Sequence, residues 1–174
     1  MKKATQPGTV LFFRHDGFFP SLIRMWTQST WDHVAIIVRA PIAGQDTSRP
    51  LIVEAVPGGV RLRELGQLEP AWWCNPLSDD PSGSVLSADL QAYANLMRGR
   101  GYDWLNDLRA AFDLPRVRNR QRQCVELVIG ALKRCGVNIP TSILRPQDLA
   151  DYLCGWGGPY ALALNAPVHP RPRS

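Results

Sequence analysis

The sequence has no long apolar run. Hydrophobic residues make up 45% and charged residues 20% of its 174 residues, which is ordinary for a globular protein. No window approaches the roughly 18 uninterrupted apolar residues that a membrane span needs. The basic start, Met-Lys-Lys-Ala-Thr, is not followed by an apolar segment long enough for a secretory signal. We therefore expect no transmembrane segment and no signal peptide. The protein is expected to be cytoplasmic at synthesis, and delivery to the cell envelope by another route stays open.

Cysteines are few and wrongly spaced for metal binding. None forms a C-x-x-C pair, and no histidine stands at ligand spacing from them, so the sequence predicts no metal site and no cofactor. Cys124 and Cys135 fall on one predicted helix, where a separation of 11 residues is about 16 Å, too far for a disulfide. All four thiols are expected to be reduced: Cys74, Cys124, Cys135 and Cys154.

The chain also lacks a strong charge of one sign. Its net charge of +5 and isoelectric point of about 9.3 permit an anionic partner without requiring one. The densest basic segment, Arg116–Arg122, has no interleaved aromatic residue and matches no nucleic-acid-binding motif. We interpret it as a solvated loop or as a rim that binds an anionic substrate, and we expect no specific nucleic-acid partner.

No internal repeat and no linker divides the sequence. One domain is expected over residues 1–165, followed by a disordered tail rich in proline and arginine over residues 166–174. The pattern is strand-like from Thr9 to Pro76 and helical from Ser87 to Leu153. That order predicts an α+β fold with a segregated sheet of about five strands rather than alternating βαβ units.

The expected strands are apolar or β-branched runs bounded by turn residues, with a hairpin at Pro57-Gly58-Gly59. They are Thr9–Phe13, Val34–Arg39, Leu51–Val56, Gly59–Leu62 and Ala71–Asn75. The expected helices show capping residues or apolar positions at helical spacing. They are Pro20–Thr27, Ser87–Arg98, a segment from Asp103 to Pro115, Gln123–Cys135, and a short helix from Pro146 to Leu153.

Cys124 lies in the first turn of the predicted helix Gln123–Cys135. Unpaired backbone N–H groups and the positive end of the helix dipole favour a thiolate at this position. Arg120 and Arg122 add positive charge nearby. A cysteine on an apolar stripe is also an ordinary core residue, but that explanation suits Cys135 better. Cys124 is therefore the candidate nucleophile.

His33 and Glu54 are the candidate partners of that nucleophile. His33 begins a predicted strand, whose rigid backbone would hold an imidazole as a general base requires. Glu54 interrupts an otherwise apolar strand. If the two strands pair, the carboxylate can meet the imidazole and fix its tautomer. The alternatives are a structural histidine, a glutamate at an exposed edge, and Asp32 or Asp103 as the partner of His33.

The other two histidines give weaker signals. His15 falls in Arg14-His15-Asp16-Gly17, which predicts a turn, and His169 lies in the proline-rich tail.

The candidate residues stand within six segments whose order is informative. These are Pro7–Phe13, Thr27–Ile37, Ile52–Ala55 with Gly58–Val60, Gly101–Trp104, Cys124–Val128 and Pro146–Leu149. In this order they resemble the circularly permuted NlpC-like branch of the papain-fold cysteine hydrolases. That branch includes bacterial and phage amidases and is similar to lecithin:retinol acyltransferase-like proteins. The resemblance covers about residues 7–153.

The resemblance implies a papain-like fold, in which an antiparallel sheet packs against a helical half that carries the Cys124 helix. It also implies a triad in which Cys124 attacks a carbonyl, His33 transfers protons, and Glu54 orients His33. The backbone N–H of Cys124 would contribute to an oxyanion hole. The residues expected to bind the substrate or the oxyanion are Tyr102, Asp32 and Trp31.

The leading hypothesis is a phage or bacterial cysteine hydrolase that cleaves an amide through a thioester, with a peptide of peptidoglycan as the expected substrate. One alternative is a lipid or ester acyl hydrolase or acyltransferase of the same fold. Another is a non-catalytic binding or structural module in which Cys124 is a core residue. Three departures from the family pattern, Thr9 for aspartate and Asp32 and Val125 for serine, leave the substrate class open. The oligomeric state is not predicted.

Overall fold

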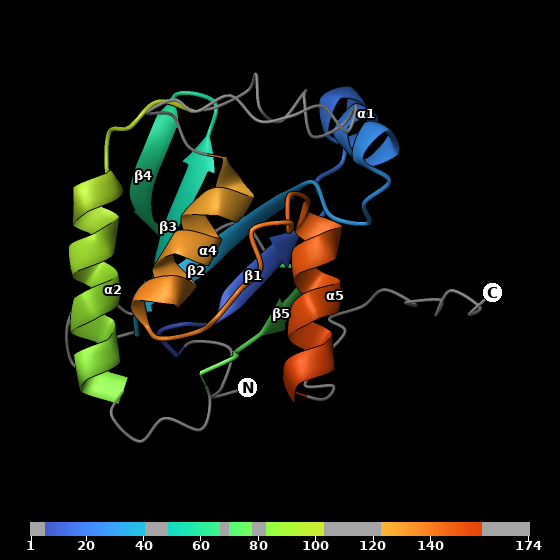
Figure 1. The fold of residues 1–174 in the computed structure, drawn as a ribbon. Helices are drawn as coiled ribbons and strands as arrows, with labels where there is room; N and C mark the ends of the chain where they lie inside the picture. The colour runs from blue at the N-terminus through green and yellow to red at the C-terminus, as the bar shows by residue number, and fades with distance from the viewer. Residues whose placement is uncertain (1–5, 41–48, 67–69, 78–82, 103–122, 158–174) are drawn as a thin grey trace.

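A five-stranded antiparallel sheet, covered on one face by helices, organises the chain (Figure 1). The computed structural model describes residues 6–40, 49–66, 70–77, 83–102 and 123–157. The elements are β1 (Val10–Phe13), α1 (Phe18–Thr27), β2 (His33–Arg39), β3 (Leu51–Val56), β4 (Gly59–Glu64), β5 (Trp72–Cys74), α2 (Gly83–Met97), α4 (Cys124–Arg134) and α5 (Pro146–Gly157). The predicted α+β class and its five strands are confirmed.

The strands lie in the order β4-β3-β2-β1-β5. Where β1 pairs with β2, Phe13 lies opposite His33. Where β2 pairs with β3, Ala35 lies opposite Glu54. Every residue of β1 is buried, and so is β2 except at its last residue. The apolar runs of the sequence thus form the interior of the sheet, as the continuous burial of a central strand requires.

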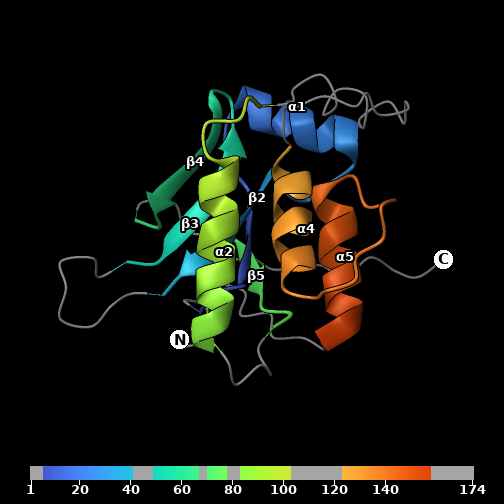
Figure 2. The same cartoon turned by 60° about the vertical axis from the view of Figure 1, so that its left-hand side comes forward.

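Alternation along the strands divides the core into two faces. One face carries Val34, Ile36 and Val53, which pack with Leu127 and Leu132 of α4. Leu90 of α2 and Leu149 of α5 join the same cluster, which we call the helix face. Figure 2 shows these three helices side by side over the sheet. The opposite face carries a smaller apolar cluster, made of Leu11, Phe13, Ala35, Ile37, Ile52 and Trp73.

The helix boundaries differ from the expected ones mainly at α2. Ser87 was expected to cap this helix, but the helix begins at Gly83, so Ser87 lies inside it. Its hydroxyl instead donates to the carbonyl oxygen of Val38 on β2, at 3.1 Å. The helix α1 begins at Phe18, two residues before the expected start.

Three expectations fall outside the described residues: the helix from Asp103, the basic segment Arg116–Arg122 and the tail over residues 166–174. Within the described ranges, no helix is long and apolar enough to span a bilayer. In the described part of the chain, Cys74, Cys124 and Cys135 form no disulfide.

The hairpin between β3 and β4 depends on two glycines. Gly58 and Gly59 have backbone φ angles of 107° and 115°. Residues that carry a Cβ rarely adopt such positive φ angles. A Cβ on Gly59 would also lie 2.6 Å from the carbonyl oxygen of Arg100, whereas a Cβ on Gly58 would meet nothing within 4 Å. The close approach lets the amide of Val60 donate to that same oxygen at 2.8 Å.

We therefore expect Gly59→Ala to destabilise the protein more than Gly58→Ala. Both substitutions force a Cβ onto a positive φ, which costs about 1–2 kcal/mol. Only Gly59→Ala adds a backbone clash, which costs roughly 1 kcal/mol or more beyond that. Urea unfolding of the two variants measures the difference, and equal free energies of unfolding would contradict it.

Candidate active site

The pairing of β2 with β3 brings His33 and Glu54 together. Glu54 lies opposite Ala35, so His33 is its diagonal neighbour on the same face of the sheet, within reach of long side chains. The distance from Nε2 of His33 to Oε2 of Glu54 is 3.0 Å. The imidazole is 11% exposed and the carboxylate 1%. The contact that the sequence suggested between these two residues is present.

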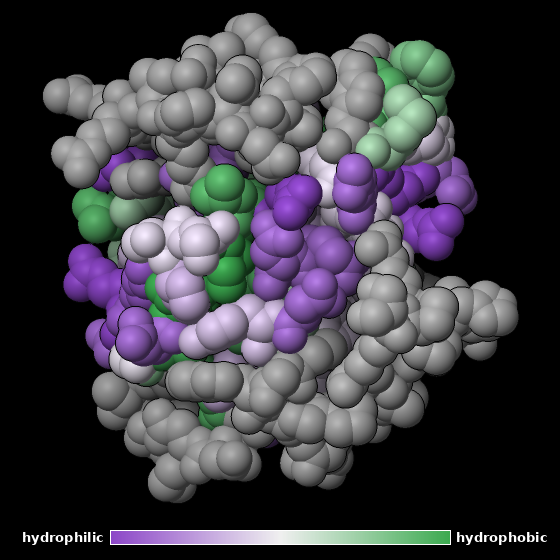
Figure 3. Space-filling view, turned by 45° about the vertical axis from the view of Figure 1, so that its right-hand side comes forward, coloured by the Kyte–Doolittle hydropathy of each residue, from purple (hydrophilic) through white to green (hydrophobic). Residues whose placement is uncertain are grey.

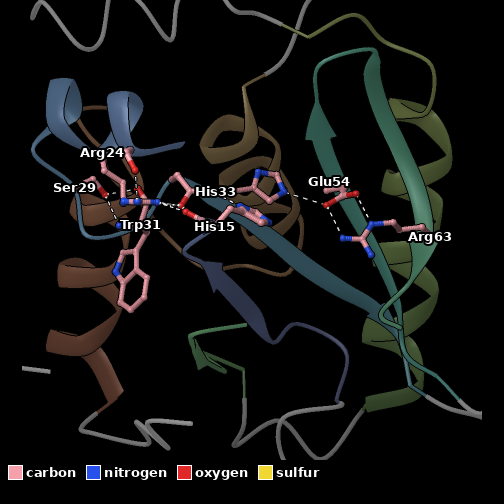
Figure 4. Close-up of polar contacts among 9 residues, drawn as sticks. His15, Arg24, Ser29, Trp31, His33, Glu54 and Arg63 are labelled. Atoms are coloured by element: carbon pink, nitrogen blue, oxygen red, sulfur yellow. Dashed lines mark hydrogen bonds and ion pairs between the residues drawn. The ribbon is translucent and has the colours of Figure 1, made fainter. Parts of the chain in front are cut away.

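Two arginines of β4 complete the surroundings of Glu54. Arg61 lies opposite Glu54 in the register of β3 with β4, and its Nε donates to Oε1 at 2.8 Å. Arg63 donates from Nε to Oε1 at 2.5 Å and from Nη2 to Oε2 at 3.2 Å. Figure 4 shows Glu54 between His33 and Arg63. The carboxylate is therefore held by one imidazole and two guanidinium groups.

These partners decide the ionisation of Glu54. Burial by itself raises the pKa of this carboxyl, but hydrogen bonds from His33, Arg63 and Arg61, together with the charge of His33, hold the pKa well below its usual range. An ionised carboxylate only accepts hydrogen bonds. Nε2 of His33 must therefore carry the proton of the shared bond, which leaves Nδ1 of the ring for another partner.

Asp32, the alternative partner for His33, binds a different histidine. Its carboxylate accepts hydrogen bonds from the backbone N–H of His15 at 2.8 Å and from Nη1 of Arg24 at 2.8 Å. It also pairs with Nδ1 of His15 at 2.5 Å. The Asp32 side chain is 4% exposed, so a second buried carboxylate holds a second imidazole.

The sequence interpretation missed His15 as part of the site. Its ring stacks on Phe13 with centroids 5.8 Å apart and lies 6.1 Å from the ring of His33. The signal lay in the strand order: Phe13 pairs with His33, so the residues just after β1 must meet those just before β2. The turn predicted over Arg14–Gly17 is not present, since residues 14–16 are irregular and only Gly17 bends the chain before α1; the local pattern also gave no register.

Trp31 and Tyr102, expected near the substrate, pack into the core of the helix face. Trp31 is 8% exposed, and its ring centroid lies 6.0 Å from Phe12 and 6.1 Å from Trp72. Tyr102 is half-buried against the same cluster. The structure therefore gives Trp31 a packing role in the sheet and places Tyr102 at the rim of that core.

Cys124 is the first residue of α4, one position from the expected helix start. It is 5% exposed and belongs to the helix-face cluster. Gln123 before it is extended and supplies no side-chain cap to the helix. Figures 1 and 2 show the first turn of α4 near the end of the sheet where β2 begins and β3 ends. Arg120 and Arg122 lie outside the described residues.

An open depression of about 500 Å³ lies beside the second histidine. Arg14, Arg24, Gln28 and Thr30 are among the residues that line it. Arg24 also donates to the carbonyl oxygen of His15 at 2.6 Å, which connects the depression to the site. The outer surface of α1 next to it is apolar (Figure 3), with exposed Phe18, Ile23 and Met25.

In the described ranges, no three histidine, cysteine or acidic side chains converge as they would around a metal ion. No protein-family model matches the chain, and no curated protein matches it. Among solved structures, the chain is similar to that of the metalloprotein yiiX from Escherichia coli O157:H7, labelled DUF1105. The TM-score is 0.55 and the sequence identity 18%, over 84% of this chain and 79% of that chain. At this identity the likeness concerns the fold alone.

Removing the charge of Glu54 is expected to destabilise the protein. Glu54→Gln leaves His33, Arg61 and Arg63 without their anion, which costs about 3 kcal/mol for a buried pair. The pKa of Glu54 is lower in the folded than in the unfolded protein. Its contribution is therefore complete above the unfolded value of about 4.3 and is lost as the pH falls below it.

The measurement is denaturant unfolding of the wild type and Glu54→Gln between pH 7 and pH 3. The difference between their free energies of unfolding should be largest at pH 7 and shrink on acidification. Glu64→Gln, at the exposed end of β4, is the matched control and should change little at any pH. A difference between wild type and Glu54→Gln that grows on acidification would contradict the ion-pair account.

Proposed function

We propose that the protein is a cysteine hydrolase with a circularly permuted papain-like arrangement, in which Cys124, His33 and Glu54 act together. The observation that carries this proposal is the buried His33–Glu54 pair, at 3.0 Å (Figure 4). By strand register this pair lies on the face of the sheet opposite the helix face, to which Cys124 belongs. The proposal therefore requires Cys124 to meet His33 at the end of the sheet where β2 and α4 both begin (Figure 1). A nucleophile at a helix N-terminus and an imidazole oriented by a carboxylate are the parts that covalent acyl transfer requires.

The tautomer of His33 supports its assigned role. Because Nε2 donates to Glu54, Nδ1 is the nitrogen that takes the thiol proton and leaves a thiolate paired with an imidazolium. The thiolate of Cys124 adds to the carbonyl carbon, and the backbone N–H of the first turn of α4 stabilises the oxyanion. His33 then protonates the leaving amine or alkoxide, which leaves an acyl thioester on Cys124. Attack by water releases the acid and the thiolate.

Glu54 acts on this chemistry through His33. Its carboxylate stays ionised because Arg61 and Arg63 bind it, so it can stabilise the imidazolium in the way a triad carboxylate does. The two arginines also balance the negative charge of Glu54. Glu54 therefore contributes to catalysis mainly by orienting the imidazole ring of His33. Glu54 is a positioning residue for His33.

An amide, with a peptide of peptidoglycan as the leading example, is the proposed substrate. A second candidate is a lipid or ester acyl group, transferred or hydrolysed by the same residues. One observation favours this candidate: Phe18 and Met25 of α1 are 76% and 65% exposed, and Met25 also lines the depression near the site. Exposed apolar patches of this kind mark binding surfaces for apolar partners.

No metal is assigned a part in this mechanism, although the similar yiiX structure is described as a metalloprotein. His15 and His33 each have a carboxylate partner, and in the described portion of the chain no group of three possible metal ligands converges.

The proposal predicts that Cys124 reacts with iodoacetamide faster than Cys74 and Cys135 at pH 6. Burial alone predicts the reverse order, because Cys124 is buried while the other two are partly exposed. A thiolate paired with an imidazolium stays reactive well below the ordinary thiol pKa of about 8.5. Labelling rates of the individual cysteine peptides between pH 5 and pH 9, followed by mass spectrometry, measure this.

The comparison protein is His33→Ala, in which the fast labelling of Cys124 should disappear at pH 6 while Cys74 and Cys135 keep their rates. If Cys124 is labelled more slowly than the other two cysteines at every pH, it is not an activated nucleophile. The protein would then be interpreted as a papain-like scaffold used for binding. The substrate class is decided separately, by incubating wild type and Cys124→Ala with bacterial peptidoglycan and with acyl esters.

A further inference from the structure

The helix α1 carries most of the exposed large apolar side chains in the described part of the chain. Such side chains are exposed at four positions there: Phe18, Ile23 and Met25 of α1, and Leu96 of α2. Phe18 is 76% exposed and Met25 is 65% exposed. Since seven residues make two helical turns, these two side chains lie on the same face of α1. Exposed apolar residues gathered in this way mark an interaction surface.

Another side of α1 is bound to the rest of the protein. Nη1 of Arg24 donates to the carbonyl oxygen of His15 at 2.6 Å and to Oδ1 of Asp32 at 2.8 Å. The backbone N–H of Ser29 donates to the carbonyl oxygen of Arg24 at 3.1 Å. Figures 1 and 2 show α1 beyond the end of the sheet where β2 begins. These contacts hold the helix in one orientation, which leaves its apolar face at the surface.

The depression next to α1 suits an anionic group. Met25 lines it together with two arginines and three polar residues: Arg14, Arg24, Gln28, Ser29 and Thr30. No acidic residue is among the described residues that line it, although the exposed Asp16 lies two positions from Arg14. Arg24 is already paired with Asp32, so the exposed Arg14 is the residue that offers its charge to a ligand. Figure 3 shows hydrophilic surface bordering the apolar surface of α1.

A phospholipid bilayer fits this combination better than a folded protein does. The three exposed side chains of α1 present roughly 300–400 Å², whereas a stable protein interface needs about 800 Å² on each partner. An apolar helix face beside cationic side chains is typical of helices that lie in the bilayer interface. The ten residues of α1 span about 15 Å, so the helix can lie along the boundary between headgroups and acyl chains. The net charge of +5 adds attraction to anionic lipids.

We propose that α1 docks the protein onto the surface of an anionic phospholipid bilayer. Phe18 and Met25 insert among the acyl chains, and Arg14 meets the headgroup phosphates at the edge of the depression. The inference goes beyond the proposed function and is independent of it, because no step of the chemistry at Cys124 enters it. It gives the exposed face of α1 a role in holding the protein at a membrane.

The test is flotation of the full chain with vesicles of phosphatidylcholine, with and without about a third of phosphatidylglycerol. The wild type should float with the anionic vesicles and less with the neutral ones. For Phe18→Ser/Met25→Ser we expect a partition coefficient at least about tenfold lower, since two apolar side chains leave the hydrocarbon. Met25→Ser alone should give an intermediate value, and it keeps the test available if the double variant does not fold. Leu96→Ser, which removes the exposed apolar side chain of α2, is the matched control and should bind like the wild type.

The part of Arg14 is measured separately. Arg14→Gln should lower the partition coefficient on anionic vesicles about fivefold and leave that on neutral vesicles unchanged. Arg98→Gln, at an exposed arginine directly after α2, should change neither. Hydrogen exchange should slow in peptides that cover α1 when anionic vesicles are added, and not in peptides that cover α2.

Three results would overturn the proposal. One is a wild type that floats with neither kind of vesicle. Another is a double variant that floats as well as the wild type, which would place the membrane contact outside α1. The third is self-association of the wild type in sedimentation, lost in the double variant and without flotation, which would make α1 an interface between two copies of the chain.

The variant Cys124→Ala separates this proposal from the hydrolase. It should float like the wild type, and loss of flotation would attribute vesicle capture to the reactive thiol and overturn the role of α1. Phe18→Ser/Met25→Ser should keep the wild-type labelling rate of Cys124. Failure of either proposal therefore leaves the other standing.

Discussion

The carboxylate of Glu54 is the group on which the geometry of the site depends. A charge that is only 1% exposed is costly to bury unless partners surround it. The partners come from the strands on either side, His33 from β2 and two arginines from β4. A shift of one residue in the register of β3 would move Glu54 to the helix face and separate it from all three. The ion-pair cluster and the strand register therefore support each other.

The two imidazole–carboxylate pairs follow from one topological fact. Because β1 and β2 are antiparallel neighbours, the chain leaves β1 and enters β2 at the same end of the sheet, which places His15 beside His33. β3 is the antiparallel neighbour of β2 on the side away from β1, so Glu54 contacts His33 from that side. Figures 1 and 2 show α4 beginning near this end too. Residues that the sequence separates widely thus gather around the start of β2.

Much of this arrangement could be predicted from the sequence because it depends on local patterns. The five strands are apolar runs between turn residues, and the contact of His33 with Glu54 follows from alternation once β2 and β3 pair. The role of Asp32 could not be predicted, since it needs the register of β1 with β2 rather than any local signal. Ser87 was misassigned because a serine before an apolar stripe resembles a cap, whereas the helix extends beyond it to Gly83. The catalytic assignment of Cys124 rests on helix position and stays a prediction.

The division of the core between the two halves of the chain also bears on biosynthesis. Ribosomes make the sheet first, and its helix face, with Val34, Ile36 and Val53, is only partly covered, by α2 among the described elements, until α4 has been made, more than 65 residues after β3 ends. Throughout that interval the nascent chain exposes apolar surface of the kind that chaperones bind and that aggregates. A chain truncated before residue 124 would keep that surface exposed, so quality control is expected to remove such fragments quickly.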